Sequence, residues 1–184
     1  MALLDGKGAI ITGGNAGIGL RIAQTFYQEG ARVVICGRRE AALMQAEKEI
    51  TQTGKGEVFS VPADVTQEAD VKRLVSETEK RYGGVDILVN AAGVMLFREF
   101  TAMDTAFLEQ LFKINTFAVS LCMAQVIPCM QKRGGGSIIN ISSLAGLRPN
   151  AGSGAYCASK AAVNMLTEVA ALEYAPDNIR VNAV

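Results

Sequence analysis

Two side chains near the end of the chain are spaced for acid–base chemistry. Tyr156 and Lys160 lie four residues apart at the start of a segment with helical spacing, so they share one helix face. A free tyrosine, with a pKa of roughly 10, is a poor proton donor at neutral pH, but a neighbouring ammonium favours the phenolate. The chain has no histidine, which excludes Ser-His-Asp hydrolysis and histidine-based metal sites. Proton transfer near neutral pH must then use a retuned tyrosine, lysine, cysteine or carboxylate, and this pair is a candidate for it.

A glycine-rich loop follows the first predicted strand, in the run Thr12-Gly13-Gly14-Asn15-Ala16-Gly17-Ile18-Gly19. Glycines let the backbone turn sharply and approach a phosphate, while the next helix offers free N–H groups to the anion. The spacing is GxxxGxG rather than the GxGxxG of the dinucleotide fingerprint. The loop predicts a phosphate site, and a plain strand-to-helix turn is the alternative.

Three motifs occur in a characteristic order. TGGNAGIG at 12–19 comes first, Asn90-Ala91-Ala92-Gly93 second, and Tyr156-Cys157-Ala158-Ser159-Lys160 third. Together they make the chain similar to the short-chain dehydrogenase/reductase family over its whole length. The resemblance implies an oxidoreductase that moves a hydride between a nicotinamide dinucleotide and a carbonyl or secondary alcohol carbon.

The same resemblance implies four catalytic residues: Asn115, Ser143, Tyr156 and Lys160. Ser143 precedes the tyrosine at the separation of the family's catalytic serine, and its hydroxyl would stabilise the developing alkoxide. Asn115 would distort its helix and hold a water that links Lys160 to solvent; a satisfied interior amide is the alternative. Ser142, one residue earlier on an alternating strand, should point away and be structural.

Cofactor contacts are also implied by the resemblance. Asp64 and Val65, after the third predicted strand, would contact the adenine, with a turn aspartate as the alternative for Asp64. Asn90 would brace the central strands. The full predicted set is Gly13, Asn15, Gly17, Ile18, Gly19, Arg38, Arg39, Asp64, Val65, Asn90, Ala91, Gly93, Tyr156 and Lys160.

The end of the second strand favours NADP(H) over NAD(H). An acidic residue there normally accepts hydrogen bonds from the ribose hydroxyls and selects NAD. Here Gly37 takes that place and Arg38 and Arg39 follow, and guanidinium groups bind a 2′-phosphate well. Against this, many NADP-using relatives have a second basic residue in the glycine loop, where this chain has Ala16. NAD(H) stays open, as does the alternative that both arginines only decorate a helix start.

The elements that must position these residues alternate along the chain. Compact Val- and Ile-rich runs predict strands at 9–12, 33–36, 58–61, 87–89, 137–141 and 179–181. Helical spacing predicts helices at about 18–29, 39–52, 67–82, 104–132 and 155–175, with Thr66 and Asp104 as N-caps. Such alternation is typical of an α/β fold, a doubly wound parallel sheet with helices on both faces, Rossmann-like. We expect a single domain over 1–184.

Composition excludes several function classes. The 18 basic and 18 acidic residues balance, so nothing favours nucleic acid or a membrane surface as a partner. The four cysteines have no metal-ligand spacing, and we expect no metal site. Without a signal-peptide pattern, the cysteines favour reduced thiols and a cytoplasmic location. The expected partners are a small carbonyl or alcohol substrate, partly apolar, and further copies of the chain.

The last predicted strand ends close to Val184. Relatives normally continue with a substrate loop and a seventh strand, so we expect the chain to be truncated after the sixth strand. Such an end would expose a sheet edge and open the substrate pocket. It keeps one alternative function open, a dinucleotide-binding protein without turnover.

The run Asn150-Ala151-Gly152 is reminiscent of 3-oxoacyl reductases. By resemblance, copies would join as a dimer or tetramer through the helices at 104–132 and 155–175, where Leu108, Leu111, Val163 and Leu166 are apolar.

Overall fold

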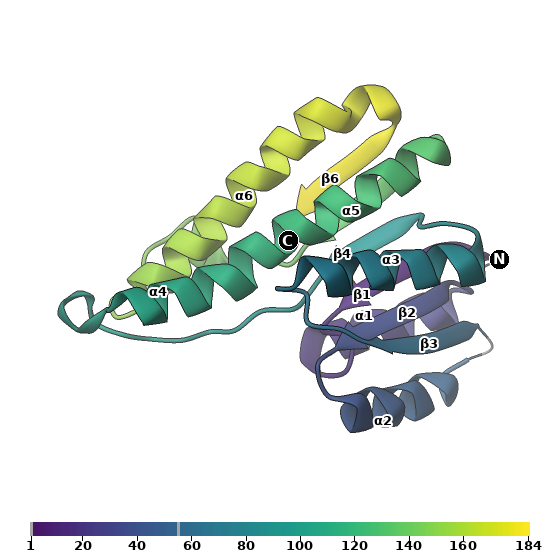
Figure 1. Ribbon diagram of the computed structural model, residues 1–184, viewed down its shortest axis with the longest axis horizontal. Helices are drawn as coiled ribbons and strands as arrows, with labels where there is room; N and C mark the ends of the chain where they lie inside the picture. Colours follow the sequence, from purple (N-terminus) through teal and green to yellow (C-terminus); the bar gives the residue numbers. More distant parts are fainter. Residues whose placement is uncertain (1, 55) are drawn as a thin grey trace.

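A computed structural model describes residues 2–54 and 56–184 of the chain. Strands and helices alternate as the sequence predicts, and the strands form one parallel sheet in the order β3-β2-β1-β4-β5-β6 (Figure 1). The strands are β1 (Gly8–Thr12), β2 (Arg32–Gly37), β3 (Glu57–Pro62), β4 (Ile87–Asn90), β5 (Gly136–Asn140) and β6 (Ile179–Ala183). The helices are α1 (Gly17–Gln28), α2 (Glu40–Thr51), α3 (Glu68–Tyr82), α4 (Thr105–Phe112), α5 (Ala118–Lys132) and α6 (Gly154–Tyr174).

Two hydrophobic layers sandwich the sheet. Side chains alternate along β1, so Ile10 packs on one face and Ile11 on the other. The first layer joins Ile10 to α3, α5 and α6, and the second joins Ile11 to α1 and α2. The expected doubly wound α/β fold is confirmed. Because all six strands are parallel, their carboxyl ends share one edge, where open α/β sheets bind ligands.

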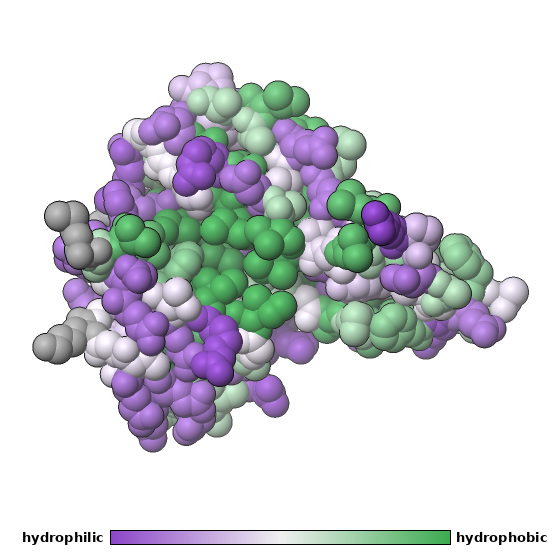
Figure 2. All heavy atoms as spheres, turned by 180° about the vertical axis from the view of Figure 1, so that it is seen from behind, coloured by the Kyte–Doolittle hydropathy of each residue, from purple (hydrophilic) through white to green (hydrophobic). Residues whose placement is uncertain are grey.

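The face of the molecule that carries α1 has an apolar area on its surface. Figure 2 shows a continuous apolar patch in the middle of this face. Half-buried side chains of the second layer include Leu20 and Phe26 of α1 and Ile139 of β5. A hollow of about 810 Å³ runs along the outer side of α1. Its lining mixes apolar side chains such as Ile18, Leu20 and Phe26 with polar ones, and it includes neither Tyr156 nor Lys160.

The expected helix at 104–132 contains a wide turn. Helix α4 runs into a π-helix, η2 (Lys113–Phe117), which leads into α5. A π turn inserts an extra residue into the helical ladder, often at functional sites. Asn115 lies in this turn, as the resemblance implies for a residue that distorts its helix. The helix N-cap at Asp104 is confirmed, because its carboxylate accepts the Phe107 N–H.

The other expected cap was wrong. Gln67, not Thr66, precedes the first turn of α3, and its side chain makes no capping bond. The Thr66 hydroxyl donates instead to the Asp64 carboxylate at 2.8 Å, so it serves the loop after β3.

The α4–α5 segment is also the one helix, among residues 2–54 and 56–184, that is long and apolar enough by composition to cross a bilayer. It spans Thr105–Lys132, and an 18-residue window within it has a mean hydropathy of 1.4. Half of that window is buried in the fold, so packing accounts for much of its apolar character. Figure 1 shows this segment and α6 side by side, projecting together beyond the carboxyl ends of the strands.

Two glycines of the phosphate loop give a stability prediction. A Cβ at Gly19 would lie 2.5 Å from the Gly13 carbonyl oxygen, whereas one at Gly17 would meet nothing within 4 Å. Gly17 has a φ of +54°, so alanine there costs only backbone strain. We expect Gly19→Ala to lower the free energy of unfolding by about 3 kcal/mol, and Gly17→Ala by about 1 kcal/mol. Urea unfolding measures both, and equal losses would contradict the clash at Gly19.

Candidate active site

The phosphate loop leaves the start of α1 open. Gly13 has a φ of +66°, and a Cβ there would lie 3.0 Å from Ala92. The N-cap of α1 is Ala16, which has no side chain able to cap the first N–H groups. These N–H groups and the positive end of the helix dipole suit a phosphate. The loop therefore fits the dinucleotide that the motif predicts.

Thr12 connects this loop to the segment after β4. It is buried at the end of β1, and its hydroxyl oxygen accepts the N–H groups of Ala91 and Ala92 at 3.0 and 3.1 Å. The small residues of the second motif are thus held directly against the glycine loop. Sequence reasoning gave Thr12 no role of its own, although it begins the first motif.

A pocket of about 360 Å³ opens beside the glycine loop at the carboxyl edge of the sheet. It brings together seven predicted cofactor contacts: Gly13, Asn15, Arg38, Arg39, Asp64, Val65 and Gly93. Gln110, Lys113 and Ile114 form part of its wall, and the sequence analysis did not single them out. Their spacing at i, i+3 and i+4 on one helix face is the signal that could have found them.

Asp64 lines the pocket and stabilises the turn after β3. Its carboxylate accepts the backbone N–H and the hydroxyl of Thr66 at 3.0 and 2.8 Å. The Asp64 N–H in turn donates to Asp70 at 2.8 Å. This bond, followed by that from Arg73, holds the pKa of the Asp70 carboxyl below its ordinary value. Asp64 thus has the turn role named as its alternative, while also lining the pocket.

Asn115 is fully buried and connects the site's segments. Its amide nitrogen donates to the Val94 carbonyl at 2.8 Å and to the Ser159 hydroxyl at 3.2 Å. Its amide oxygen accepts the Val94 N–H at 2.8 Å. A Cβ on Gly93 would lie 3.3 Å from that oxygen and 3.8 Å from the Lys160 nitrogen, so the small residue lets these groups approach.

Lys160 lies on the same face of α6 as Tyr156. Its ammonium is 5.9 Å from the centre of the tyrosine ring and donates to the Ile141 carbonyl at 2.8 Å. Burial lowers the pKa of Lys160, because removal from water disfavours the charged form. Tyr156 is half-buried and packs in a small cluster with Val94, Phe107 and other apolar residues. The spacing thus places the two groups together, as the sequence predicts.

Ser143 and Ser142 line the same hollow but have different hydrogen-bond partners. The Ser143 oxygen accepts the Ala145 N–H at 3.1 Å, which leaves its own hydrogen free to donate. The Ser142 hydroxyl instead lies against Asn164 and the Lys160 carbonyl, so its position is structural. Ser143 is half-buried beside a hollow of about 560 Å³ that Leu144 also lines.

Asn90 has a bracing side chain. It donates to Asn140 at 2.9 Å, and Asn140 donates to Thr167 of α6 at 2.9 Å. This buried polar chain joins β4, β5 and α6. The other seven predicted cofactor contacts do not line the pocket beside the glycine loop: Gly17, Ile18, Gly19, Asn90, Ala91, Tyr156 and Lys160.

The residues 7–184 match the family model described as short chain dehydrogenase. The chain therefore belongs to the short-chain dehydrogenase family, whose members are oxidoreductases. It is 36% identical over 184 residues to an uncharacterized oxidoreductase of Staphylococcus saprophyticus, covering all of this chain and 79% of that one. It is 38% identical over 181 residues to 2,5-dichloro-2,5-cyclohexadiene-1,4-diol dehydrogenase of Sphingobium indicum, covering 98% of this chain and 72% of that one.

Solved structures agree in fold. A 7α-hydroxysteroid dehydrogenase complexed with NADH and 7-oxo glycochenodeoxycholic acid superposes with a TM-score of 0.93 at 38% identity, covering 98% of this chain and 70% of that one. An NAD⁺-bound xylitol dehydrogenase superposes with a TM-score of 0.95 at 32% identity, covering 98% and 70%. The chain is thus shorter than these relatives.

The bonds of Asn115 give a prediction for the site's stability. Asn115→Leu leaves the half-buried N–H and carbonyl of Val94 without their partners and also removes the buried bond to Ser159, so the free energy of unfolding should fall by about 2–4 kcal/mol. As a control, Asn164→Leu removes a half-buried bond at the site's edge and should cost about 1 kcal/mol. Chemical denaturation measures both, and an equally stable Asn115→Leu variant would contradict the clamp.

Proposed function

We propose that this chain reduces a carbonyl to a secondary alcohol, or the reverse, with NADP(H) as the hydride carrier. The observation that carries the proposal is the Tyr156–Lys160 pair on one face of α6. The Ser143 hydroxyl, whose oxygen accepts the Ala145 N–H, keeps its hydrogen for a further hydrogen bond. The glycine cradle and the pocket after β2 and β3 fit a dinucleotide on the same edge of the sheet. Bound there, the nicotinamide supplies or accepts the hydride.

Each of the four proposed catalytic residues has a task that its contacts permit. Tyr156 donates the proton to the carbonyl oxygen, and Ser143 donates a hydrogen bond that stabilises charge on that oxygen. Lys160, held by the Ile141 carbonyl, places its nitrogen 5.9 Å from the centre of the Tyr156 ring, close to the proposed proton donor. Asn115 fixes Val94 and Ser159, and through Ser159 the first turn of α6 that carries the tyrosine.

The NADP(H) preference rests on the end of β2. Arg38 and Arg39 line the pocket, and neither makes an ion pair with the residues that the structure describes. Two unpaired guanidinium groups suit a phosphate ester. NAD(H) is the alternative, because the 7α-hydroxysteroid and xylitol dehydrogenase structures contain NADH and NAD⁺.

For the substrate we propose a partly apolar molecule, as of 3-oxoacyl type. Val94 and Leu96 pack against Tyr156. Three further apolar side chains are close in sequence to the proposed catalytic residues and are exposed: Phe97 at 62%, Leu144 at 67% and Leu147 at 76%. Side chains of this kind would contact hydrocarbon rather than a strongly charged ligand.

We also propose association of copies through the long helices. Leu111 and Val163, expected at such a contact, are fully buried inside the protein and cannot form it. The exposed apolar side chains on these helices are instead Leu108, Phe117, Met165, Val169 and Leu172. Family members are commonly oligomeric, and this exposed set is the surface that we propose for the contact.

The tyrosine assignment is tested by removing one oxygen atom. Tyr156→Phe should abolish NADPH oxidation with a panel of carbonyl compounds, because no other proposed group replaces the proton donor. NADPH affinity, measured by fluorescence, should change less than about twofold, since the phenol is offered to the substrate. Tyr174→Phe, near the far end of α6, is the control and should keep normal turnover. Normal turnover by Tyr156→Phe would sink the assignment.

The cofactor preference is tested at Arg38. Arg38→Ala should weaken NADPH binding about tenfold, the value of one charge-assisted contact at an exposed place, and leave NADH binding nearly unchanged. Arg180→Ala, on the distant β6, is the matched control. Equal affinities of the wild-type protein for NADPH and NADH would overturn the preference while leaving the reaction intact.

A further inference from the structure

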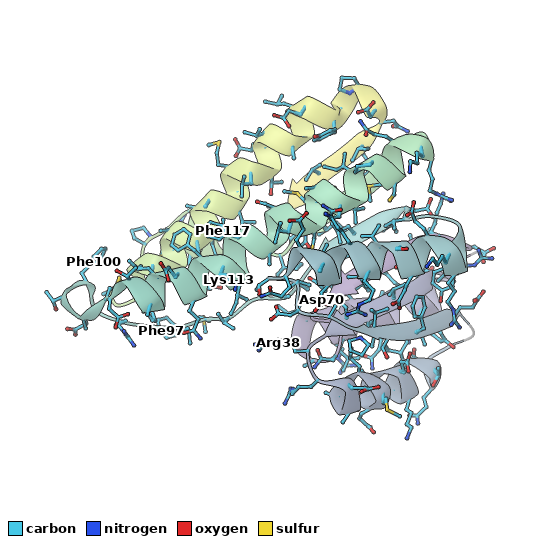
Figure 3. All side chains as sticks on the ribbon, in the orientation of Figure 1. Arg38, Asp70, Phe97, Phe100, Lys113 and Phe117 are labelled. Atoms are coloured by element: carbon cyan, nitrogen blue, oxygen red, sulfur yellow. The ribbon has the colours of Figure 1, made fainter. Side chains whose placement is uncertain are left out.

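Lys113 and Arg38 line the proposed dinucleotide pocket from two different walls. Arg38 follows β2, whereas Lys113 begins the π-helix after α4. Both line the same pocket, and Figure 3 labels the two side chains near the edge where the strands have their carboxyl ends. With Gln110 and Ile114, Lys113 occupies one helix face, so the geometry of the helix directs it toward the pocket.

The charge around this pocket is strongly one-sided. Arg38, Arg39 and Lys113 are its three cations, and Asp64 is its one anion. Among the residues that the structure describes, none of the three cations makes an ion pair. The Asp64 carboxylate is already engaged by Thr66. A ligand that carries more than one negative charge would offset this excess.

The glycine loop leaves a place for such a cation. Its Ala16, at the N-cap of α1, contributes no positive charge. A lysine on the opposite wall can supply that charge without changing the loop. Its ammonium is a compact charge on a flexible stem, so it can approach a phosphate from a wall that does not touch the loop.

We propose that Lys113 is a specificity-determining residue, whose ammonium binds the phosphate on the adenosine ribose from the side opposite Arg38. The 2′-phosphate would then be held by a cation of the β2 end and by a cation of the α4–η2 helix, since both line the pocket. This rests on the proposed NADP(H) function and extends it to a residue outside the three sequence motifs.

Binding of the adenosine half alone tests the proposal without any readout of activity. Calorimetry measures the affinity of wild-type protein, Lys113→Met and Lys132→Met for adenosine 2′,5′-bisphosphate and for adenosine 5′-monophosphate. Both lysines are exposed, so the variants should fold, and Lys132 ends α5 far from the pocket.

Lys113→Met should lower the affinity for the bisphosphate on the order of fivefold, because it removes a charge contact that solvent screens. The affinity for the monophosphate should fall less than about twofold. Lys132→Met should change neither affinity. In the wild-type protein the preference for the bisphosphate should shrink as salt is raised, and in Lys113→Met it should shrink less.

Two results overturn the proposal in distinguishable ways. If wild-type protein binds both probes and Lys113→Met keeps the preference, or loses both affinities equally, Lys113 does not select the phosphate and the proposed function still stands. If wild-type protein binds neither probe and neither NADPH nor NADH, the proposed function fails and the role of Lys113 fails with it.

Discussion

The buried amide of Asn115 is the interaction on which the site depends most. A π turn places this side chain in the interior, where it bonds to both backbone groups of Val94 and to Ser159. One residue thereby fixes the segment after β4, the helix that borders the pocket and the first turn of α6. A buried amide without hydrogen-bond partners would lower the free energy of unfolding, so the three segments stabilise one another through Asn115.

Around this clamp, the parallel sheet supplies the remaining order. Each strand ends at the same edge, and each functional group follows a strand end or faces one: the glycine loop after β1, the arginines after β2, Asp64 after β3 and Ser143 after β5. Hydrogen bonds then join neighbouring strand ends: the Ala91 N–H donates to Thr12, and Asn90 donates to Asn140. Asn140 in turn donates to Thr167 of α6. The proposed chemistry uses the small space that these bonds leave open.

The sequence predicted the fold well because its signals are local. Val- and Ile-rich runs and helical spacing placed every strand and helix to within a few residues, and the four-residue spacing brought Tyr156 and Lys160 together. The direction that each side chain takes has no such signal. The Thr66 hydroxyl turned to Asp64 rather than to the helix, Leu111 and Val163 were buried rather than exposed, and Lys113 reached the pocket. The side chain of Asn90 confirms the brace, since its partner lies on the next strand.

The central claim is that the chain transfers a hydride between the dinucleotide and a carbonyl carbon. NADPH that carries deuterium at the transferable position, incubated with the protein and a series of apolar ketones, tests it directly by mass spectrometry of the products. The account predicts an alcohol with one deuterium on its carbinol carbon. Tight NADPH binding with no deuterium in any product would contradict it, and would instead indicate a dinucleotide-binding protein without turnover.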